Sequence, residues 1–373
     1  MSSFGVEERT LLNDTTRQYF ETEYPFKHFM KVSAQHGGNG WDRSCWQACA
    51  RLGWLGVAVG GASGGAGGGL TELAIVMSAA ARQLSLEPWT PTCAVSMYLL
   101  EHAQSTAARG WLAQAVEGEL TFALCHYEPD GGFARDYIKA TADTANDSFL
   151  LNGHKTFTLH AGNADLLLVT ARIGDTSGPL AVFALAPDTP GLTRTCAAAL
   201  DGRHGASVAL DNVHCDANAL LFDPGEKTQA LVDNALDRGA LANAAEAAGA
   251  MASVSEQTVD YLKNRQQFGK PLSSFQVLQH RLVDMSLRCE ESRAVVMRAL
   301  IVLDSGTPDT QHVIWQTKML VSRAAQAVGA DAIQLHGGMG MTDELPIGHY
   351  YKRLLVCASQ YGDGDWYANR LSG

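Results

Sequence analysis

The sequence of 373 residues predicts an α+β protein with a helical N-terminal domain, a central β domain and a helical C-terminal domain. Three observations support this order. Apolar residues recur at three- and four-residue spacing near the start, short β-type runs fill the middle, and three long helical patterns follow. These changes of pattern place the domains at residues 1–118, 119–225 and 226–373.

The N-terminal domain is predicted to be helical from Glu7 to about Glu117, with an interruption at residues 60–69, GGASGGAGGG. Each glycine inside a helix costs about 1 kcal/mol relative to alanine, so this run is predicted to be a loop. Its backbone N–H groups could line a ligand, because glycine allows close approach to the backbone.

The central domain contains β-type runs at residues 166–171 (LLLVTA), 180–185 (LAVFAL) and 208–213 (VALDNV). Turn signals such as Asn152-Gly153 and Asp201-Gly202 lie between the runs of this domain. About seven strands follow one another without an intervening helical pattern, which predicts an antiparallel barrel or sandwich rather than a doubly wound sheet.

The C-terminal domain carries helical patterns over residues 240–263, 275–304 and 313–336. The first is rich in alanine, and the other two have apolar residues at helical spacing. Three long helices with short connections predict a helical bundle.

Composition argues against several classes of function. Lys and Arg total 28 against 39 Asp and Glu, and the net charge of −11 does not suit a nucleic-acid surface or an anionic membrane. The apolar stretches are shorter than the ~20 residues of a membrane span, and the N-terminus lacks a signal-peptide pattern. The eight cysteines form no CxxC pair and no metal set, so we expect reduced thiols in a soluble, cytoplasmic protein.

Common catalytic motifs are missing. The sequence contains no GxSxG or HExxH motif, and no lysine follows a glycine run as in a P-loop. Residues 337–340, GGMG, follow a predicted helix instead of opening one after a strand, so they do not meet the Rossmann pattern. By themselves they predict a helix end and a turn.

Four segments carry a more specific signal in combination. Residues 265–272, RQQFGKPL, lead into Phe275-Gln276, and residues 334–342, QLHGGMGMT, follow later. Upstream lie EPDGG at residues 128–132 and LNGHK at residues 151–155. In this order and at these separations, over nearly the whole chain, they resemble the acyl-CoA dehydrogenase family.

This resemblance implies a fold, a cofactor and a reaction. The fold has an N-terminal helical domain, a central antiparallel β barrel and a C-terminal four-helix bundle, in agreement with the patterns above. FAD lies between barrel and bundle, with the acyl-CoA thioester stacked on the flavin. A carboxylate removes the α proton, the β hydride passes to the flavin, and the usual acceptor is electron-transfer flavoprotein.

In the family, one group of residues reaches over to the neighbouring subunit's FAD and holds its pyrophosphate and adenosine. The matching positions here are Arg265, Phe268, Gln276, Gln334, Gly337 and Gly338. Arg265 can pair with a phosphate through its planar guanidinium, and the two glycines let backbone N–H groups approach it. This group is intact.

A second group in the family faces the chain's own flavin ring, and here the sequence departs from the family pattern. Phe157 keeps the expected aromatic residue. Tyr127 replaces a small hydroxyl residue, Phe133 replaces a serine, and Leu159 replaces a threonine whose hydroxyl meets the flavin. Two bulky rings and a lost hydroxyl would crowd the flavin and leave its polar atoms without partners.

The family's catalytic glutamate is also missing. Counted from Gln334, its usual place falls at Tyr361 or Gly362, and its other place falls near Gly239. Asp363 is the only local candidate for the base, while the glycines on both sides of it are typical of a solvated turn. The catalytic residue therefore stays open.

These two patterns predict one subunit of a heteromeric FAD-dependent acyl-CoA dehydrogenase, a heterotetramer whose partner chain supplies the glutamate. Such heteromers act in bacterial degradation of steroid side chains and related bulky acyl-CoA esters, which suggests that substrate class by analogy. Two alternatives are open. One is a self-sufficient homo-oligomeric flavoenzyme with Asp363 as base, and the other is a flavin-free structural or binding paralogue.

Overall fold

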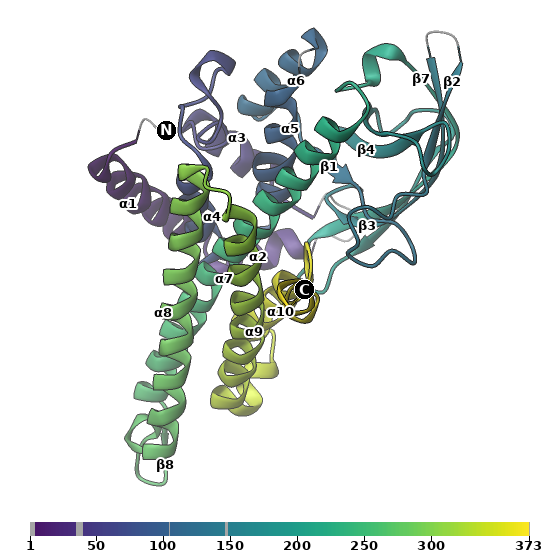
Figure 1. The fold of residues 1–373 in the computed structure, drawn as a ribbon. Helices are drawn as coiled ribbons and strands as arrows, with labels where there is room; N and C mark the ends of the chain where they lie inside the picture. The colour runs from purple at the N-terminus through teal and green to yellow at the C-terminus, as the bar shows by residue number, and fades with distance from the viewer. Residues whose placement is uncertain (1–3, 35–39, 104, 146–147, 373) are drawn as a thin grey trace. The chain divides into compact units, whose positions relative to one another are not determined.

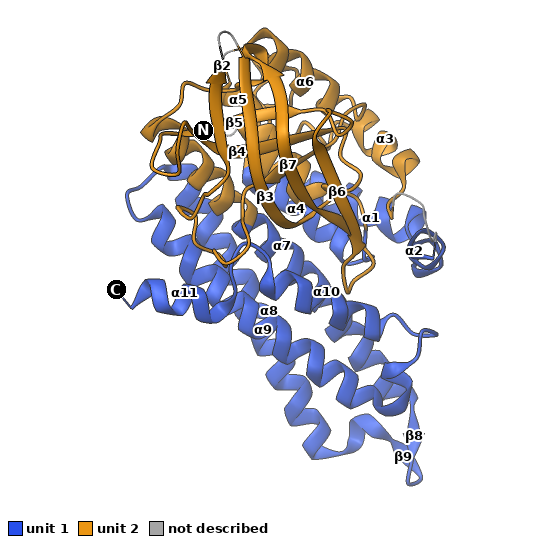
Figure 2. Cartoon of the chain, turned by 90° about the vertical axis from the view of Figure 1, so that its right-hand side faces the viewer, with its two compact units in different colours: residues 1–34, 70–85, 240–373 blue, residues 35–69, 86–239 orange. Residues whose placement is uncertain are grey.

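The computed structural model describes residues 4–34, 40–103, 105–145 and 148–372. The chain forms two compact units, which are coloured separately in Figure 2. Unit 1 comprises Met1–Ala34, Leu70–Ser85 and Ala240–Gly373, and unit 2 comprises Gln35–Gly69 and Leu86–Gly239. The helices of the N-terminal third are therefore divided between the two units.

Unit 2 is built on a curled sheet, in which the described residues form seven strands in the order β1-β4-β2-β3-β7-β6, with β5 paired to β4 (Figure 1). The strands are β1 Phe122–Cys125, β2 Thr141–Ala145, β3 Ser148–Leu159, β4 Leu166–Ile173, β5 Leu180–Leu185, β6 Leu192–Ala198 and β7 His204–Asp216. Its helices include α3 Arg43–Arg51, a π-helix at Trp89–Ser96, α5 Met97–His102 and α6 Thr106–Val116. The three predicted β-type runs are confirmed as parts of β4, β5 and β7.

The sheet is mostly antiparallel, as predicted, but β4 runs parallel to both β1 and β2. After β1 the chain passes through the loop that begins at His126 and forms the β2–β3 hairpin before it returns as β4. Parallel pairing needs a long connection of this kind, so the short runs in the sequence did not reveal it.

Glycine is required at one point inside β3. Gly153 has φ +147°, and a Cβ at this position would lie 2.6 Å from Ala140. The register between β3 and β7 shifts between Leu151 and Gly153, as at a β-bulge. The sequence predicted a turn at Asn152-Gly153. The structure corrects this, because the pair lies inside a continuous strand.

Unit 1 is helical apart from the short hairpin of β8 (Gln266–Gln267) and β9 (Lys270–Pro271). It contains α1 Val6–Glu23, α2 Phe26–Ser33, α4 Leu70–Ala81, most of α7 Glu226–Asn264, α8 Gln276–Ser305, α9 Thr310–His336, α10 Ile347–Ser359 and α11 Gly364–Leu371. The three long helices predicted from the sequence are confirmed. α7 begins earlier than expected.

A buried ion pair joins the helices of unit 1. The Arg353 side chain on α10 is 1% exposed, and its Nη1 donates to Glu246 Oε1 on α7 at 3.1 Å. The same nitrogen donates to Ser85 O, beyond the end of α4, at 2.9 Å. A charge so deeply buried must be paired, and these partners connect three segments that are far apart in the sequence.

The glycine run at residues 60–69 is a loop with one turn of 3-10 helix, as predicted. It closes on itself, since Gly65 N donates to Gly60 O at 3.2 Å and Gly67 N donates to Val59 O at 2.8 Å. Most of the loop's N–H groups therefore bond to carbonyl groups of the loop or of residues 56–59. The Gly60 N–H donates to Glu101 Oε1 at 2.8 Å. These bonds leave few N–H groups for a ligand, so the structure does not support the expectation that the run lines one.

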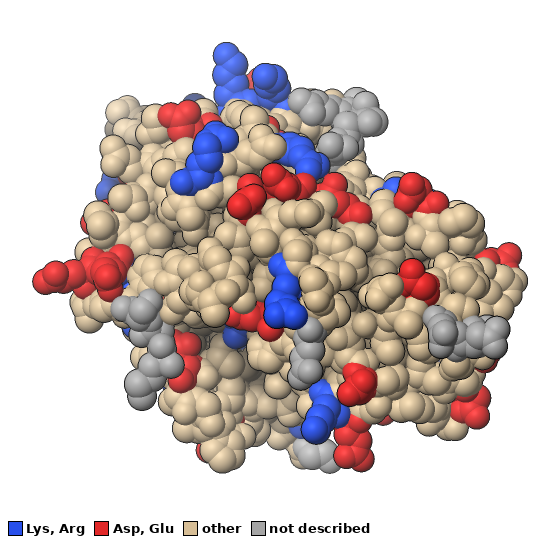
Figure 3. Space-filling view, turned by 90° about the horizontal axis from the view of Figure 1, so that it is seen from above, with Lys and Arg blue, Asp and Glu red and all other residues tan. Residues whose placement is uncertain are grey.

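No helix of the described chain is both long and apolar enough to cross a bilayer. On the face shown in Figure 3, Lys and Arg side chains are scattered among Asp and Glu side chains. That face therefore lacks the continuous basic surface that a nucleic acid would need, in agreement with the net charge of −11.

Candidate functional site

The six residues expected to hold an FAD tail all belong to unit 1 and are all exposed. Arg265 follows the last residue of α7, Phe268 lies at the tip of the β8–β9 hairpin, and Gln276 opens α8. Gln334 lies in the last turn of α9, where Gly337 and Gly338 follow. In Figures 1 and 2 the hairpin and the end of α9 lie toward the same end of the helical bundle.

The hairpin presents its aromatic tip to the outside. Phe268 is 87% exposed and has φ +55°, and Gly269 follows with φ +77°. Leu272 N donates to Arg265 O at 2.8 Å, which closes the base of the hairpin. A phenylalanine held in a left-handed conformation and exposed to this extent suits contact with a ligand or another chain.

The arginine is free to meet a phosphate. Among the residues that the structure describes, no carboxylate lies within ion-pair distance of the Arg265 guanidinium, so the alternative of a surface ion pair is not observed. The Arg265 guanidinium, the side-chain amides of Gln276 and Gln334 and the backbone at Gly338 are donors of the kind that bind a diphosphate.

The glycine turn differs in detail from the sequence expectation. The Gly337 N–H donates to Gln334 O and Ile333 O and so completes the end of α9, with Gly337 at φ +61°. Gly338 lies on the outside of the turn, where an added Cβ would meet nothing within 4 Å. A ligand would therefore approach the backbone at Gly338, while Gly337 shapes the turn.

Two residues that the sequence reasoning missed join these parts. The rings of Tyr261 on α7 and His336 at the end of α9 stack with centroids 4.2 Å apart and planes at 27°. Tyr261 stands four residues before Arg265, and His336 directly precedes Gly337. The sequence signal that could have pointed to these residues was their position: Tyr261 lies one helical turn before Arg265, and His336 is adjacent to Gly337.

The positions that face the flavin ring in the family belong to unit 2, and aromatic side chains fill part of them. The rings of Tyr127 and Phe133 meet edge to face, with centroids 6.1 Å apart. Burial raises the pKa of Tyr127 to about 12, although the nearby Arg135 guanidinium opposes the shift. The two bulky residues therefore pack against each other beside the Glu128 loop.

A buried polar network supports the same loop. Lys155 Nζ lies 2.5 Å from Glu128 Oε1, and both side chains are almost fully buried. Glu128 also accepts from Lys139 N at 2.6 Å. Next to it, Arg135 Nη2 donates to Asp237 Oδ1 at 2.7 Å in a second buried pair. These pairs fix the loop in one conformation.

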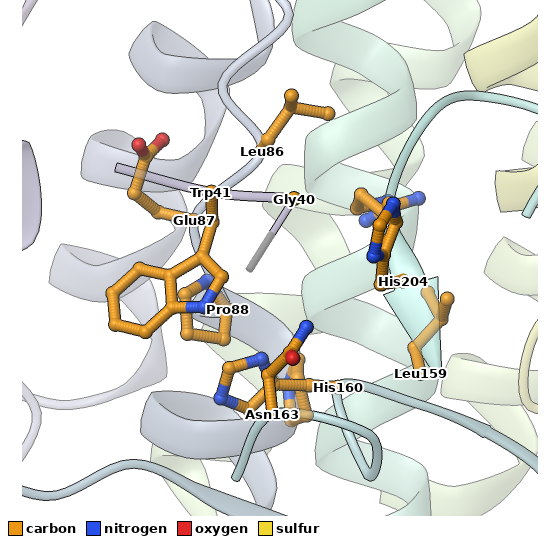
Figure 4. Close-up of a pocket in the computed structure, with 11 residues that line it drawn as sticks. Gly40, Trp41, Leu86, Glu87, Pro88, Leu159, His160, Asn163 and His204 are labelled. Atoms are coloured by element: carbon orange, nitrogen blue, oxygen red, sulfur yellow. The ribbon is translucent and has the colours of Figure 1, made fainter. Parts of the chain in front are cut away.

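The two remaining ring-facing positions lie on β3. The Phe157 ring is 38% exposed, so one side of it is open to a ligand. Leu159 lines a small pocket, partly open to solvent, together with Trp41, His160 and Asn163 (Figure 4). At this place the chain offers an aliphatic side chain instead of the hydroxyl expected in the family.

The candidate base is engaged in a structural contact. Asp363 is the N-cap of α11, and its Oδ1 accepts from Trp366 N at 2.8 Å and from Asp365 N at 3.1 Å. Tyr361 and Gly362, at the usual place of the glutamate, form a turn with φ +58° and +113°. Gly239 is buried in α7. Whether Asp363 acts as a base stays a prediction.

A buried lysine lies on another helix of the bundle. Lys318 on α9 is fully buried, and its Nζ donates to Cys357 O at 2.7 Å and to Ser322 Oγ at 3.0 Å. Burial lowers its pKa to about 8. Because Lys318 donates to a carbonyl group near the end of α10, its role is to hold α9 against α10.

Within the described residues, no three His, Cys, Asp or Glu side chains gather as a metal site.

A curled sheet combined with helical domains is the fold expected of a flavoprotein oxidoreductase that acts on acyl-CoA. Three acyl-CoA dehydrogenase domain families match the sequence: the N-terminal domain at residues 6–119, the middle domain at 123–213 and the C-terminal domain at 230–365. The chain belongs to the acyl-CoA dehydrogenase family. Members of this family are FAD flavoproteins, so the predictions of fold, enzyme class and cofactor are confirmed.

Relatives of known activity are similar over most of the chain. Human mitochondrial short-chain specific acyl-CoA dehydrogenase is 28% identical over 310 residues, which cover 81% of this chain and 74% of that protein. L-prolyl-[peptidyl-carrier protein] dehydrogenase of a Serratia species is 29% identical over 314 residues, covering 80% of each chain.

Solved structures show the same fold. A variant of the Tcur3481–Tcur3483 steroid ACAD is 27% identical with a TM-score of 0.88, covering 98% of this chain and 97% of that one. The ChsE4–ChsE5 complex of Mycobacterium tuberculosis is 21% identical with a TM-score of 0.90, covering 100% and 98%.

Proposed function

We propose that this chain is one subunit of a heteromeric, FAD-dependent acyl-CoA dehydrogenase, and that a partner chain of the same family supplies the catalytic glutamate. One contrast carries the proposal. The FAD-tail residues of unit 1 are exposed and available, whereas Tyr127 and Phe133 occupy ring-facing positions and the places of the base hold Tyr361, Gly362 and Gly239.

In this role the chain binds and orients the cofactor. Arg265 pairs with the diphosphate, Gly338 lets it approach the backbone, and Phe268 covers it with an apolar ring. When bound, the flavin supplies the hydride acceptor that dehydrogenation needs. The partner's glutamate removes the α proton, a step for which this chain offers no established base.

The proposal also covers the substrate, the assembly, the electron acceptor and the cellular location. The substrate is an acyl-CoA thioester, and similarity to a steroid ACAD whose name joins two polypeptides, Tcur3481 and Tcur3483, favours a bulky steroid-like acyl group and a heterotetramer. Electron-transfer flavoprotein is the acceptor. Eight free cysteines, six of them buried, suit a cytoplasmic location.

The test is co-purification with candidate partner chains of the same family, followed by the flavin spectrum and the count of FAD per chain. We expect little flavin with the chain alone and stoichiometric FAD with its partner. Yellow, active protein from this chain alone would overturn the partner requirement, and a flavin-free active complex would overturn the FAD role.

Arg265 gives a residue-level test on the assembled enzyme. Arg265→Ala removes the fork to the diphosphate and should weaken FAD binding by one to two orders of magnitude, about the effect of losing a charge-assisted contact. Arg293→Ala is the matched control, because Arg293 is exposed on α8 and pairs only with the neighbouring Glu290 in the described structure. Equal FAD affinity in both variants would contradict the proposal.

A further inference from the structure

We infer that Tyr261 and His336 are positioning residues of the FAD-tail site, because their stacked rings hold the Arg265 end of α7 and the Gly337–Gly338 turn of α9 together as one binding unit. The inference rests on the proposed function, since it concerns how that site keeps its shape before the cofactor binds.

The stack connects the two halves through named contacts. The centroids of the two rings are 4.2 Å apart and their planes are inclined by 27°. The Tyr261 hydroxyl also donates to His336 O at 3.5 Å. On the α7 side, Arg265 N donates to Tyr261 O at 2.8 Å, so the arginine is bonded to the residue that carries the ring.

His336 is held just as firmly on the α9 side. It is 5% exposed, and its Nδ1 donates to Ala332 O at 2.9 Å. The next residue, Gly337, completes α9 through its N–H and turns the chain at φ +61°. A fixed ring therefore stands directly before the turn that a diphosphate would approach.

Neither half contains all the donors expected to meet the diphosphate. Arg265 and the glycine turn are exposed, and 70 residues lie between Arg265 and His336 in the sequence. A diphosphate needs both halves at one separation, and a site that must be assembled during binding loses affinity. The stack supplies that separation in advance.

The prediction is that Tyr261→Leu weakens FAD binding to the assembled enzyme by about tenfold, because the separation is no longer set before binding. FAD affinity is measured by titrating the apo complex and following flavin fluorescence. Tyr261→Phe keeps the ring and should stay within about twofold of the unmodified protein. His336→Leu removes the stack from the other side and should match Tyr261→Leu.

A control separates this effect from general loss of stability. Tyr19 on α1 also packs against a neighbouring ring, Phe20, with centroids 5.4 Å apart, and it lies outside the site. Tyr19→Leu should lower the thermal midpoint and leave FAD affinity unchanged. If Tyr19→Leu weakens FAD binding as much as Tyr261→Leu, the positioning role is overturned.

A double-mutant cycle tests whether Tyr261 acts through Arg265. In an Arg265→Ala background, Tyr261→Leu should weaken binding by much less than its own tenfold, since the group it positions is gone. Fully multiplicative effects would overturn the inference. An effect of Arg265→Ala without one of Tyr261→Leu or His336→Leu would overturn the inference alone, while no effect of Arg265→Ala would overturn the proposed function.

Discussion

The buried His126 in unit 2 makes the stability of the protein depend on pH. Its side chain is 1% exposed, with Nδ1 3.2 Å from Thr170 Oγ1 and Nε2 3.1 Å from Arg135 O. Burial, together with the Lys155 charge, lowers its pKa to about 3 from the ordinary 6.5. The ring is therefore neutral in the folded protein at all but very acidic pH.

This shift predicts a loss of stability in acid. Between pH 6.5 and about 3 the unfolded state binds a proton at His126 that the folded state does not, so the free energy of unfolding falls as pH drops through this window. Urea unfolding from pH 7 to 4 measures the slope. His126→Gln should be less stable at pH 7 but have a shallower slope. Parallel curves for the two proteins would contradict this account.

At the scale of elements, close approach between helices depends on glycine at particular points. Gly249 lies in α7, and a Cβ there would come within 2.3 Å of Ser78 O on α4. Gly110 lies in α6, where a Cβ would meet nothing within 4 Å. Glycine is therefore needed for the close approach of α7 to α4 at Gly249, whereas no neighbouring atom requires it at Gly110.

The two positions predict opposite outcomes for the same substitution. Gly249→Ala should destabilise the protein by about 1–3 kcal/mol, because overpacking against a carbonyl outweighs the gain in helix propensity. Gly110→Ala should stabilise it by about 0.5–1 kcal/mol. Chemical denaturation of both variants is the measurement. Stabilisation by Gly249→Ala would show that α4 and α7 can separate without cost.

For the whole molecule, the proposed function places the catalytic base on a partner chain rather than at Asp363. Asp363→Asn removes the carboxylate charge and keeps an N-cap for α11, since asparagine caps helices as well as aspartate does. In the proposed heteromer we expect the rate of flavin reduction by substrate to change by less than about twofold, because the partner's glutamate would take the proton. Rapid-mixing spectroscopy measures this rate. A loss of several orders of magnitude would instead support a self-sufficient enzyme.

Much of the fold followed from local patterns. The three long helices and the buried strand β5 lie where the sequence predicted them, because the spacing of apolar residues that indicates a helix or a strand is a local property of the sequence. Asn152-Gly153 misled because the pair is common in turns, whereas a bulge in β3 depends on pairing with β7. The glycine loop misled because most of its N–H groups bond to nearby carbonyl groups and the Gly60 N–H bonds to Glu101.

The six residues expected to hold the FAD tail could be predicted from the sequence because each lies in a short contiguous motif; their role stays a prediction. The Tyr261–His336 stack could not, because two residues 75 positions apart meet only when α7 and α9 pack. The contact of Tyr127 with Phe133 and the capping role of Asp363 are local, and they became clear only from the backbone directions of those loops.

The amino-acid sequence by itself determined the family, the FAD cofactor and the succession of helical, β and helical segments, because local periodicity and contiguous motifs encode them. Only the tertiary structure decided the parallel pairs of β4, the ring stack beside Arg265 and the exposure of the FAD-tail residues. The physical reason is that packing brings together side chains from distant segments, and solvent exposure depends on all of them at once.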